Sequence, residues 1–109
     1  MIISLPHALD HSALRFPTKD AVRSGKKLLS YAELQRQANS LAAILRANGV
    51  QRGDRVGLYM NKDVESAVSV YGIMKAGAAY VPLDPYAPVS RLSYVITDCN
   101  INIVISKPN

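Results

Sequence analysis

The stretch Met74–Pro85 constrains the fold most, because it encodes a helix end, a strand and a turn in immediate succession (MKAGAAYVPLDP). Lys75 lies where a cation complements the carbonyl end of a helix. Gly77 supplies the left-handed residue that closes many helices. A helix is therefore expected to end at this point of the chain.

The residues after Gly77 predict a short buried strand followed by a turn. Ala78–Val81 is a compact apolar run, and we expect Pro82 and Pro85 to stop it from continuing far as a strand. Asp84 precedes a proline and is biased toward extended geometry, which sets up a turn. Judged by spacing alone, the whole stretch is the helix-to-strand joint of an α/β domain and has no chemical role.

The first half of the chain predicts a helix, a small hairpin and a second helix. The helix is expected over Pro6–Phe16, the hairpin strands over Ala21–Arg23 and Lys27–Leu29, and the second helix from Ser30 to Gly49. Ser30 with Glu33 three residues later is a capping box, in which each residue satisfies a backbone amide of the other. This second helix has a clear apolar stripe, formed by Leu34, Ala38, Leu41 and Leu45.

The second half alternates strands and helices. Strands are expected over Arg55–Met60, Ala78–Val81 and Ile101–Ser106, with helices from a cap at Asn61 to about Ala76 and from Pro88 to Asn100. This order predicts parallel strands joined by right-handed crossovers. The helix after Asn61 is apolar nearly all round, so it should be buried on more than one side. The last helix should turn one face inward, formed by Leu92, Val95, Ile96 and Cys99.

Composition is that of one globular α/β domain. The chain has 109 residues, of which 49% are hydrophobic and 19% charged. Thirteen Lys and Arg against eight Asp and Glu give a net charge of +5, but only Lys26 and Lys27 are adjacent. Because aromatic residues are not interleaved with the basic ones, we expect no nucleic-acid binding. The sequence shows no signal peptide and no membrane span, which predicts a cytoplasmic protein.

A few residues could carry chemistry, and each has a plainer interpretation. His7 and His11 are four residues apart on one helical face, a spacing used by zinc sites, but no third ligand is indicated. Asp63 and Glu65 fit the first turn of a helix better than a general acid–base pair. Cys99 is alone, so it predicts no disulfide, and we expect a small buried hydrophobe.

Several ordered motifs resemble the adenylate-forming superfamily: amino-acid adenylation domains of nonribosomal peptide synthetases, acyl-CoA synthetases and luciferases. The segments that carry the resemblance are Leu29–Leu34, Gly53–Val56, Met74–Asp84, and the pattern Pro88, Arg91, Leu92, Tyr94 and Asp98. The resemblance covers nearly the whole chain, from about Ala8 to Ser106. The form AYVPLDP is similar to that of amino-acid adenylation domains and related acyl or aryl ligases.

The resemblance implies the N-terminal part of the adenylate-forming fold, here a single partial domain over residues 1–109. It also implies a parent enzyme that uses ATP and Mg²⁺ to join a carboxylate to AMP. The acyl group would then pass to a phosphopantetheine thiol, on a carrier protein or on coenzyme A. The family's phosphate loop, adenine motif, ribose aspartate and catalytic lysine lie further along a longer chain. None falls on this sequence, so we expect no catalytic, cofactor-binding or metal residue here, and no catalysis by this chain alone.

Three interpretations stay open at the level of sequence. The chain is the N-terminal portion of an adenylating ligase; or a naturally short or split protein that complements a partner carrying the catalytic motifs; or an unrelated α/β binding domain. Because the motifs of the longer family members are missing here, the helix from Asn61 and the strand edge at Ile101–Ser106 should leave apolar surface and unpaired backbone exposed. We therefore expect self-association, as a homodimer.

Overall fold

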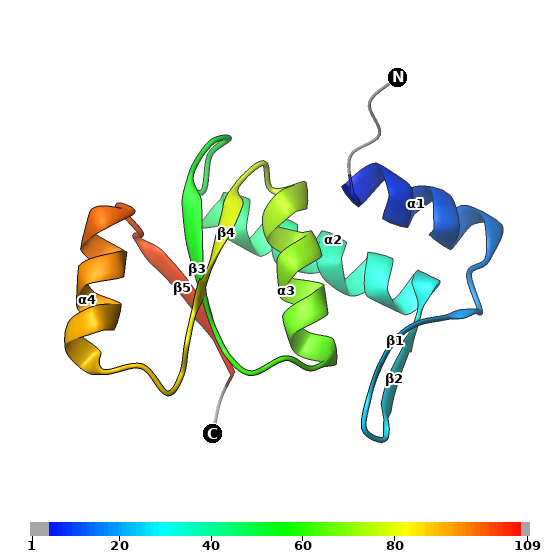
Figure 1. Cartoon of the computed structure of the whole chain (residues 1–109). Coiled ribbons are helices and arrows are strands. Elements are labelled where there is room, and N and C mark those ends of the chain that lie inside the picture. Colours follow the sequence, from blue (N-terminus) through cyan, green and yellow to red (C-terminus); the bar gives the residue numbers. More distant parts are fainter. Residues whose placement is uncertain (1–4, 108–109) are drawn as a thin grey trace.

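The computed structural model describes residues 5–107 and contains the expected elements in the expected order (Figure 1). They are α1 (Leu5–Arg15), β1 (Asp20–Ser24), β2 (Lys27–Ser30), α2 (Tyr31–Ala47), β3 (Arg55–Tyr59), α3 (Val64–Lys75), β4 (Ala79–Leu83), α4 (Val89–Asp98) and β5 (Ile103–Ser106). No helix in this range is both long and apolar enough to cross a membrane.

The strands form two separate sheets. β1 and β2 form an antiparallel hairpin, and β3 lies between β4 and β5 in a three-stranded sheet. Both pairings in the larger sheet are parallel, and Gly57 in the central strand is opposite Val81 on one side and Val104 on the other. The predicted parallel α/β arrangement is confirmed.

The larger sheet has helices on both of its sides (Figure 1). α2 and α3 lie on one side, with α1 and the hairpin beyond them, and α4 stands on the other side. Parallel sheets need both faces covered, because their strands are apolar on both faces. α2 and α3 cover one face, although Ile103 and Ile105 of β5 stay partly exposed there. α4, by contrast, contains no buried residue.

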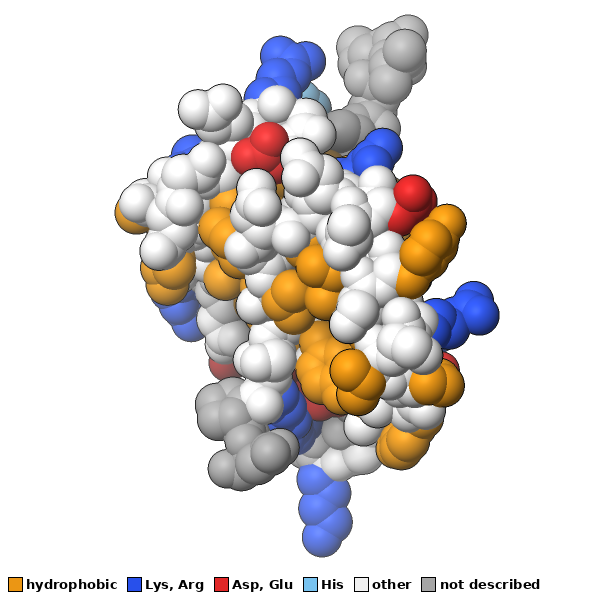
Figure 2. All heavy atoms as spheres, turned by 90° about the vertical axis from the view of Figure 1, so that its left-hand side faces the viewer, with side chains coloured by type: hydrophobic (Ala, Val, Ile, Leu, Met, Phe, Trp, Pro, Cys, Tyr) orange, Lys and Arg blue, Asp and Glu red, His pale blue; other side chains and the backbone are white. Residues whose placement is uncertain are grey.

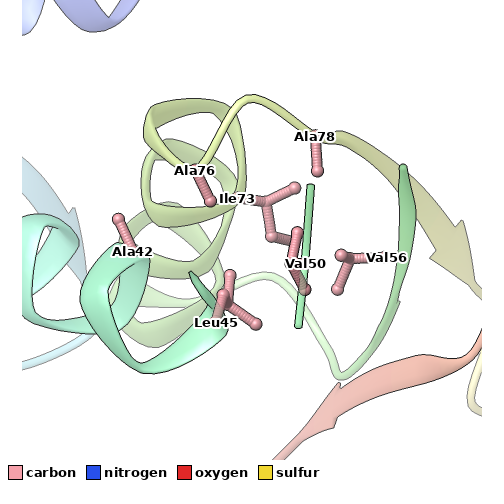
Figure 3. Packing of buried hydrophobic residues seen from close by; sticks show 7 residues of the cluster. All are labelled: Ala42, Leu45, Val50, Val56, Ile73, Ala76 and Ala78. Atoms are coloured by element: carbon pink, nitrogen blue, oxygen red, sulfur yellow. The ribbon is translucent and has the colours of Figure 1, made fainter. Parts of the chain in front are cut away.

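The main core fills the space between the sheet and the α2–α3 pair. Its buried members come from α2, the loop after it, β3, α3 and the connection from α3 to β4: Ala42, Leu45, Val50, Val56, Ile73, Ala76 and Ala78 (Figure 3). Ile73 and Val56 are the largest fully buried side chains. Ile103 and Ile105 of β5 pack against this cluster from the edge of the sheet. Of the apolar stripe predicted for α2, Leu41 and Leu45 pack in or against this core.

A second cluster holds α1 and the hairpin against the two central helices. It consists of Leu9, Leu29, Leu34, Ala38, Val64 and Val68. Because these residues come from α1, β2, α2 and α3, the N-terminal elements are part of the same folded unit as the sheet.

α2 and α3 pack tightly where Leu41 of α2 meets Gly72 of α3. A Cβ added to Gly72 would lie 2.8 Å from Cδ2 and 2.9 Å from both Cβ and Cγ of Leu41. Carbon atoms normally keep about 3.5–4.0 Å apart. Only glycine lets the two helix axes come this close, so Gly72 accounts for the tight packing of the pair.

Two local predictions were wrong. Asp63, and not Asn61, caps α3: its side chain accepts from the amide of Ser66 at 3.0 Å, and the hydroxyl of Ser66 accepts from the amide of Asp63 at 2.9 Å. Two reciprocal hydrogen bonds outweigh the single one that Asn61 could offer. β4, predicted to be a buried strand, is exposed at Ala79, Tyr80 and Pro82, although it ends at Leu83, before Pro85, as expected. β4 is an edge strand, where a missing N–H can face away from the neighbouring strand.

Candidate functional site

The two glycine-containing motifs of the sequence lie against each other. The amide of Gly53 donates to the carbonyl of Gly77 at 3.0 Å, and the amide of Ala79 donates to the carbonyl of Asp54 at 2.8 Å. Both glycines have a φ of +88°, which L-residues with a side chain rarely adopt. A Cβ on Gly77 would also come within 3.3 Å of the Arg52 Cα. These two hydrogen bonds thus fix the connection between α3 and β4 against the turn before β3.

Lys75 lies in the last turn of α3 as predicted, and it also has a second role. Its side chain is only 9% exposed, and Nζ lies 2.5 Å from Oδ1 of Asp10 in α1. Asp10 also accepts a hydrogen bond from Gln35 at 3.0 Å. Partial burial raises the pKa of Asp10, but the hydrogen bonds from Lys75 and Gln35 outweigh it, so the pKa is lowered overall. Lys75 therefore ties α3 to α1.

The motif Leu29–Leu34 also has a structural role. The Ser30 hydroxyl accepts from the amide of Glu33 at 3.2 Å, and the Glu33 carboxylate accepts from the amide of Ser30 at 3.1 Å. The backbone and hydroxyl hydrogen bonds of Ser30 lower the pKa of Glu33. The predicted capping box is confirmed, and it starts α2 directly after β2.

Asp63 and Glu65 belong to a charge cluster at the start of α3. Lys107, just after β5, lies 2.9 Å from Asp63 and 3.5 Å from Glu65, and Lys27 of the hairpin lies 2.7 Å from Glu65. Burial raises the pKa of Asp63, but the hydrogen bonds from Lys107 and from the Ser66 amide lower it overall.

Glu65 and Lys107 of the same cluster also have shifted pKa values. The hydrogen bond from Lys27 lowers the pKa of Glu65, and the bond to Asp63 raises that of Lys107. Each of these groups is thus held in its charged form near neutral pH. Through these ion pairs the cluster links the end of β5 and the hairpin to the start of α3.

The turn after β4 places the start of α4. The Asp84 carboxylate accepts from the amide of Tyr86 at 2.9 Å, and its carbonyl accepts from the amide of Ala87 at 3.1 Å. The Tyr59 hydroxyl donates to the Pro85 carbonyl at 3.4 Å, which links the turn to β3. Within α4, Tyr94 of the family-like pattern is 69% exposed.

The remaining candidate residues stay apart. Within residues 5–107, no group of three or more His, Cys, Asp and Glu side chains is arranged to hold a metal ion, so His7 and His11 gain no third ligand. Cys99 is half-buried rather than fully buried as expected, because α4 covers its side of the sheet incompletely. The sequence missed the ion pairs of Lys75 and Lys107, whose partners are 65 and 44 residues away.

Known proteins share this architecture. The family described as AMP-binding enzyme matches residues 9–109. Tyrocidine synthase 3 of Brevibacillus parabrevis is 41% identical over 104 residues, which are 95% of this chain and 2% of that protein. The chain therefore spans only a small part of this curated relative.

Solved structures agree over almost the whole chain. The N-terminal subdomain of NpsA from Klebsiella oxytoca superposes with a TM-score of 0.87 at 28% identity, covering 96% of this chain and 28% of that one. An artificial fusion of NpsA, an adenylation–PCP di-domain, superposes with a TM-score of 0.91 at 27% identity, over 99% of this chain and 20% of that one.

A further structure shows a nucleotide-bound relative. The AMPPNP-bound form of the nonribosomal peptide synthetase FmoA3 superposes with a TM-score of 0.88 at 37% identity, covering 92% of this chain and 11% of that one. The matched segments form the N-terminal part of adenylation domains. Two of the sequence motifs are in direct backbone contact in the structure, and the family match covers residues 9–109. This chain therefore belongs to the AMP-binding enzyme family.

Proposed function

We propose that this chain forms the N-terminal portion of an ATP-dependent ligase that activates a carboxylate, most closely an amino-acid adenylation domain. The main observation behind the proposal is the backbone hydrogen bond from Gly53 to Gly77, because it brings two of the family's motifs into direct contact. The match to residues 9–109 and the similarity to tyrocidine synthase 3 support it further.

The proposed reaction has two steps. The carboxylate attacks the α-phosphate of ATP, which forms an acyl-adenylate and releases pyrophosphate. A phosphopantetheine thiol then attacks the acyl carbon and releases AMP. A carrier protein is the acceptor that the adenylation–PCP relative suggests, and coenzyme A is the alternative. ATP and Mg²⁺ would be bound by the remainder of the domain, in the cytoplasm.

Within that enzyme, this chain supplies scaffold and not chemistry. Several of its charged side chains form pairs that tie elements together, such as Lys75 with Asp10 and Lys107 with Asp63. Its glycines shape turns and a helix contact, and do not form a phosphate-binding loop. Alone, the chain therefore does not catalyse adenylation.

The test is amino-acid-dependent ATP–pyrophosphate exchange by the isolated chain in the presence of Mg²⁺. We expect no exchange above the blank with any proteinogenic amino acid. The complete adenylation domain of tyrocidine synthase 3, assayed in parallel, is the positive control. Exchange by the isolated chain that depends on one carboxylate would refute the non-catalytic role.

A further inference from the structure

Most of the positive net charge of the chain lies in one short segment, residues 15–30. This segment contains five of the 13 Lys and Arg residues but only one of the eight Asp and Glu residues. Five cations against one carboxylate give +4, whereas the whole chain has a net charge of +5. The segment comprises the end of α1 and the hairpin β1–β2, which stands at the end of the molecule away from α4 (Figure 1).

The opposite end of the molecule has a different character. Figure 2 views the side that carries α4 and shows hydrophobic and uncharged side chains across its middle, with most charged ones toward the rim. The charge of the chain is therefore distributed unevenly, with a basic end at the hairpin. A concentrated charge of one sign attracts partners of the opposite sign to that end.

The hairpin is fixed to the rest of the fold through its inner face. Leu29 of β2 is buried in the second cluster, and Val22, opposite it on β1, packs against the same cluster. Lys27 pairs with Glu65 of α3 at 2.7 Å. Because successive side chains of a strand point to opposite faces, Leu28, between Lys27 and Leu29, points outward.

The outer face of the hairpin is basic, with one apolar residue. Arg23 and Leu28 are paired across the two strands, and Leu28 is 42% exposed. Asp20 lies 3.7 Å from Arg23, but both side chains are largely exposed, so this ion pair stabilises the fold little. Lys26 in the turn forms no ion pair or side-chain hydrogen bond with the described residues. We call Arg23, Lys26 and Leu28 the basic hairpin face.

An acidic polypeptide is the ligand that fits this face best. The guanidinium of Arg23 can donate two parallel hydrogen bonds to one carboxylate. Leu28 requires an apolar side chain opposite it, which a protein segment can supply beside its carboxylates. The hairpin is already ordered, so binding costs it little conformational entropy.

Nucleic acid fits the face less well. Proteins that bind single strands combine cations with aromatic side chains on which the bases stack. Phe16 is the only aromatic residue of the segment, and Arg15 Cζ and Lys19 Nζ lie over its ring, 5.5 and 4.6 Å from the centroid. The ring is thus occupied by cations of the protein itself.

We propose that the basic hairpin face binds an acidic segment of another polypeptide, with carboxylates against Arg23 and Lys26 and an apolar side chain against Leu28. A second copy of this chain is a poor partner. Among its described residues, Asp63 and Glu65 lie close together, but both are already paired with lysines of the same chain. The contact does not depend on the proposed function, since the face lies outside the motifs that carry the family resemblance.

Fluorescence anisotropy with a labelled acidic peptide tests the proposal on the whole chain. The probe is an alanine-based helix of about 15 residues, with glutamates four residues apart and a leucine on the same side. We expect saturable binding that weakens as the salt concentration rises, because salt screens exposed charges. The same peptide with lysines in place of the glutamates should not bind.

Charge-reversal variants with a matched control locate the contact. Arg23→Glu combined with Lys26→Glu should weaken peptide binding by about tenfold. Arg52→Glu combined with Arg91→Glu changes the net charge equally, at exposed positions outside the face, and should weaken binding by less than about twofold. Leu28→Ser leaves the charge unchanged and should weaken binding by about threefold, through loss of the apolar contact.

Selective weakening by the hairpin variants would support the proposal. Absence of saturable binding, or equal weakening by the control variant, would overturn it. Tighter binding of oligothymidylate, or of vesicles that contain phosphatidylserine, would assign the face to nucleic acid or to membrane and would also overturn it. If the reversed variant loses the helical circular dichroism of the unmodified chain, Arg23→Gln combined with Lys26→Gln takes its place and should weaken binding by about threefold.

Discussion

Replacing Gly72 with alanine tests the helix contact at the centre of this fold. In an ordinary helix interior, alanine is more favourable than glycine by about 1 kcal/mol. Here the new methyl group would lie 2.8–2.9 Å from three side-chain atoms of Leu41. One of these is Cβ, which is fixed to the α2 backbone, so a change of rotamer cannot relieve the contact. The two helices would have to separate by roughly 0.7–1 Å to restore normal distances.

The expected effect is a net loss of stability. Overpacking a well-filled contact costs about 1–3 kcal/mol. Subtracting the gain of about 1 kcal/mol in helix propensity leaves a destabilisation of about 1 kcal/mol. For a domain of this size, that lowers the melting temperature by about 4–8 °C. Ile73, the adjacent residue and fully buried, would move with the helix and disturb the main core.

Urea unfolding of Gly72→Ala measures this loss. Ser40→Ala, at an exposed position of α2, is the control, and should be neutral or stabilising because no contact opposes its helix propensity. Leu41→Ala removes two of the three crowding atoms, so the penalty of Gly72→Ala should shrink in that background. A Gly72→Ala variant stabilised by the full propensity gain would refute the close contact of α2 and α3.

Four further outcomes are expected. Asp10→Ala leaves the nearly buried ammonium of Lys75 without its carboxylate and should lower the free energy of unfolding by about 1–3 kcal/mol, measured in urea. The loss should exceed that of Lys75→Met, and the reverse order would contradict the ion pair. The lowered pKa values of Asp10 and Asp63 give stability that is present above an unfolded pKa of about 3.9 and is lost as the pH falls through the folded values. The urea midpoint should therefore be flat from about pH 7 to 5 and fall below about pH 4, whereas a rise on acidification would refute this linkage. Ser30→Ala should cost about 1 kcal/mol through loss of the α2 cap, and an unchanged midpoint would show that the cap is dispensable. The isolated chain should self-associate through its exposed apolar surface in sedimentation equilibrium, and a strictly monomeric species at high concentration would argue against it.

Local chemistry explains why the sequence predicted the elements so well. The capping box of Ser30 and Glu33 needs only residues within one helical turn, and the left-handed Gly77 closes α3 as expected. The parallel sheet followed from the alternation of strands and helices. The cap of α3 was misplaced because Ser66 completes a reciprocal box with Asp63, a partner that the usual Glu or Gln rule does not indicate.

Tertiary contacts set the limit of that prediction. The sequence placed Lys75 at a helix end but could not indicate Asp10, which lies 65 positions away and meets it only when α1 packs on α3. It assigned the inner face of α4 correctly, yet the incomplete cover of that face depends on what lies beside β5. The continuation of β4 through Pro82 likewise depends on the strand's place at the edge of the sheet.

The most direct test of the central claim is carboxylate-dependent ATP–pyrophosphate exchange by the fusion of this chain with the remainder of the tyrocidine synthase 3 adenylation domain. We expect exchange by the fusion and none by either part alone, because the scaffold lies in this chain and the chemistry in the remainder. A fusion that unfolds cooperatively but shows no exchange with any amino acid would contradict it.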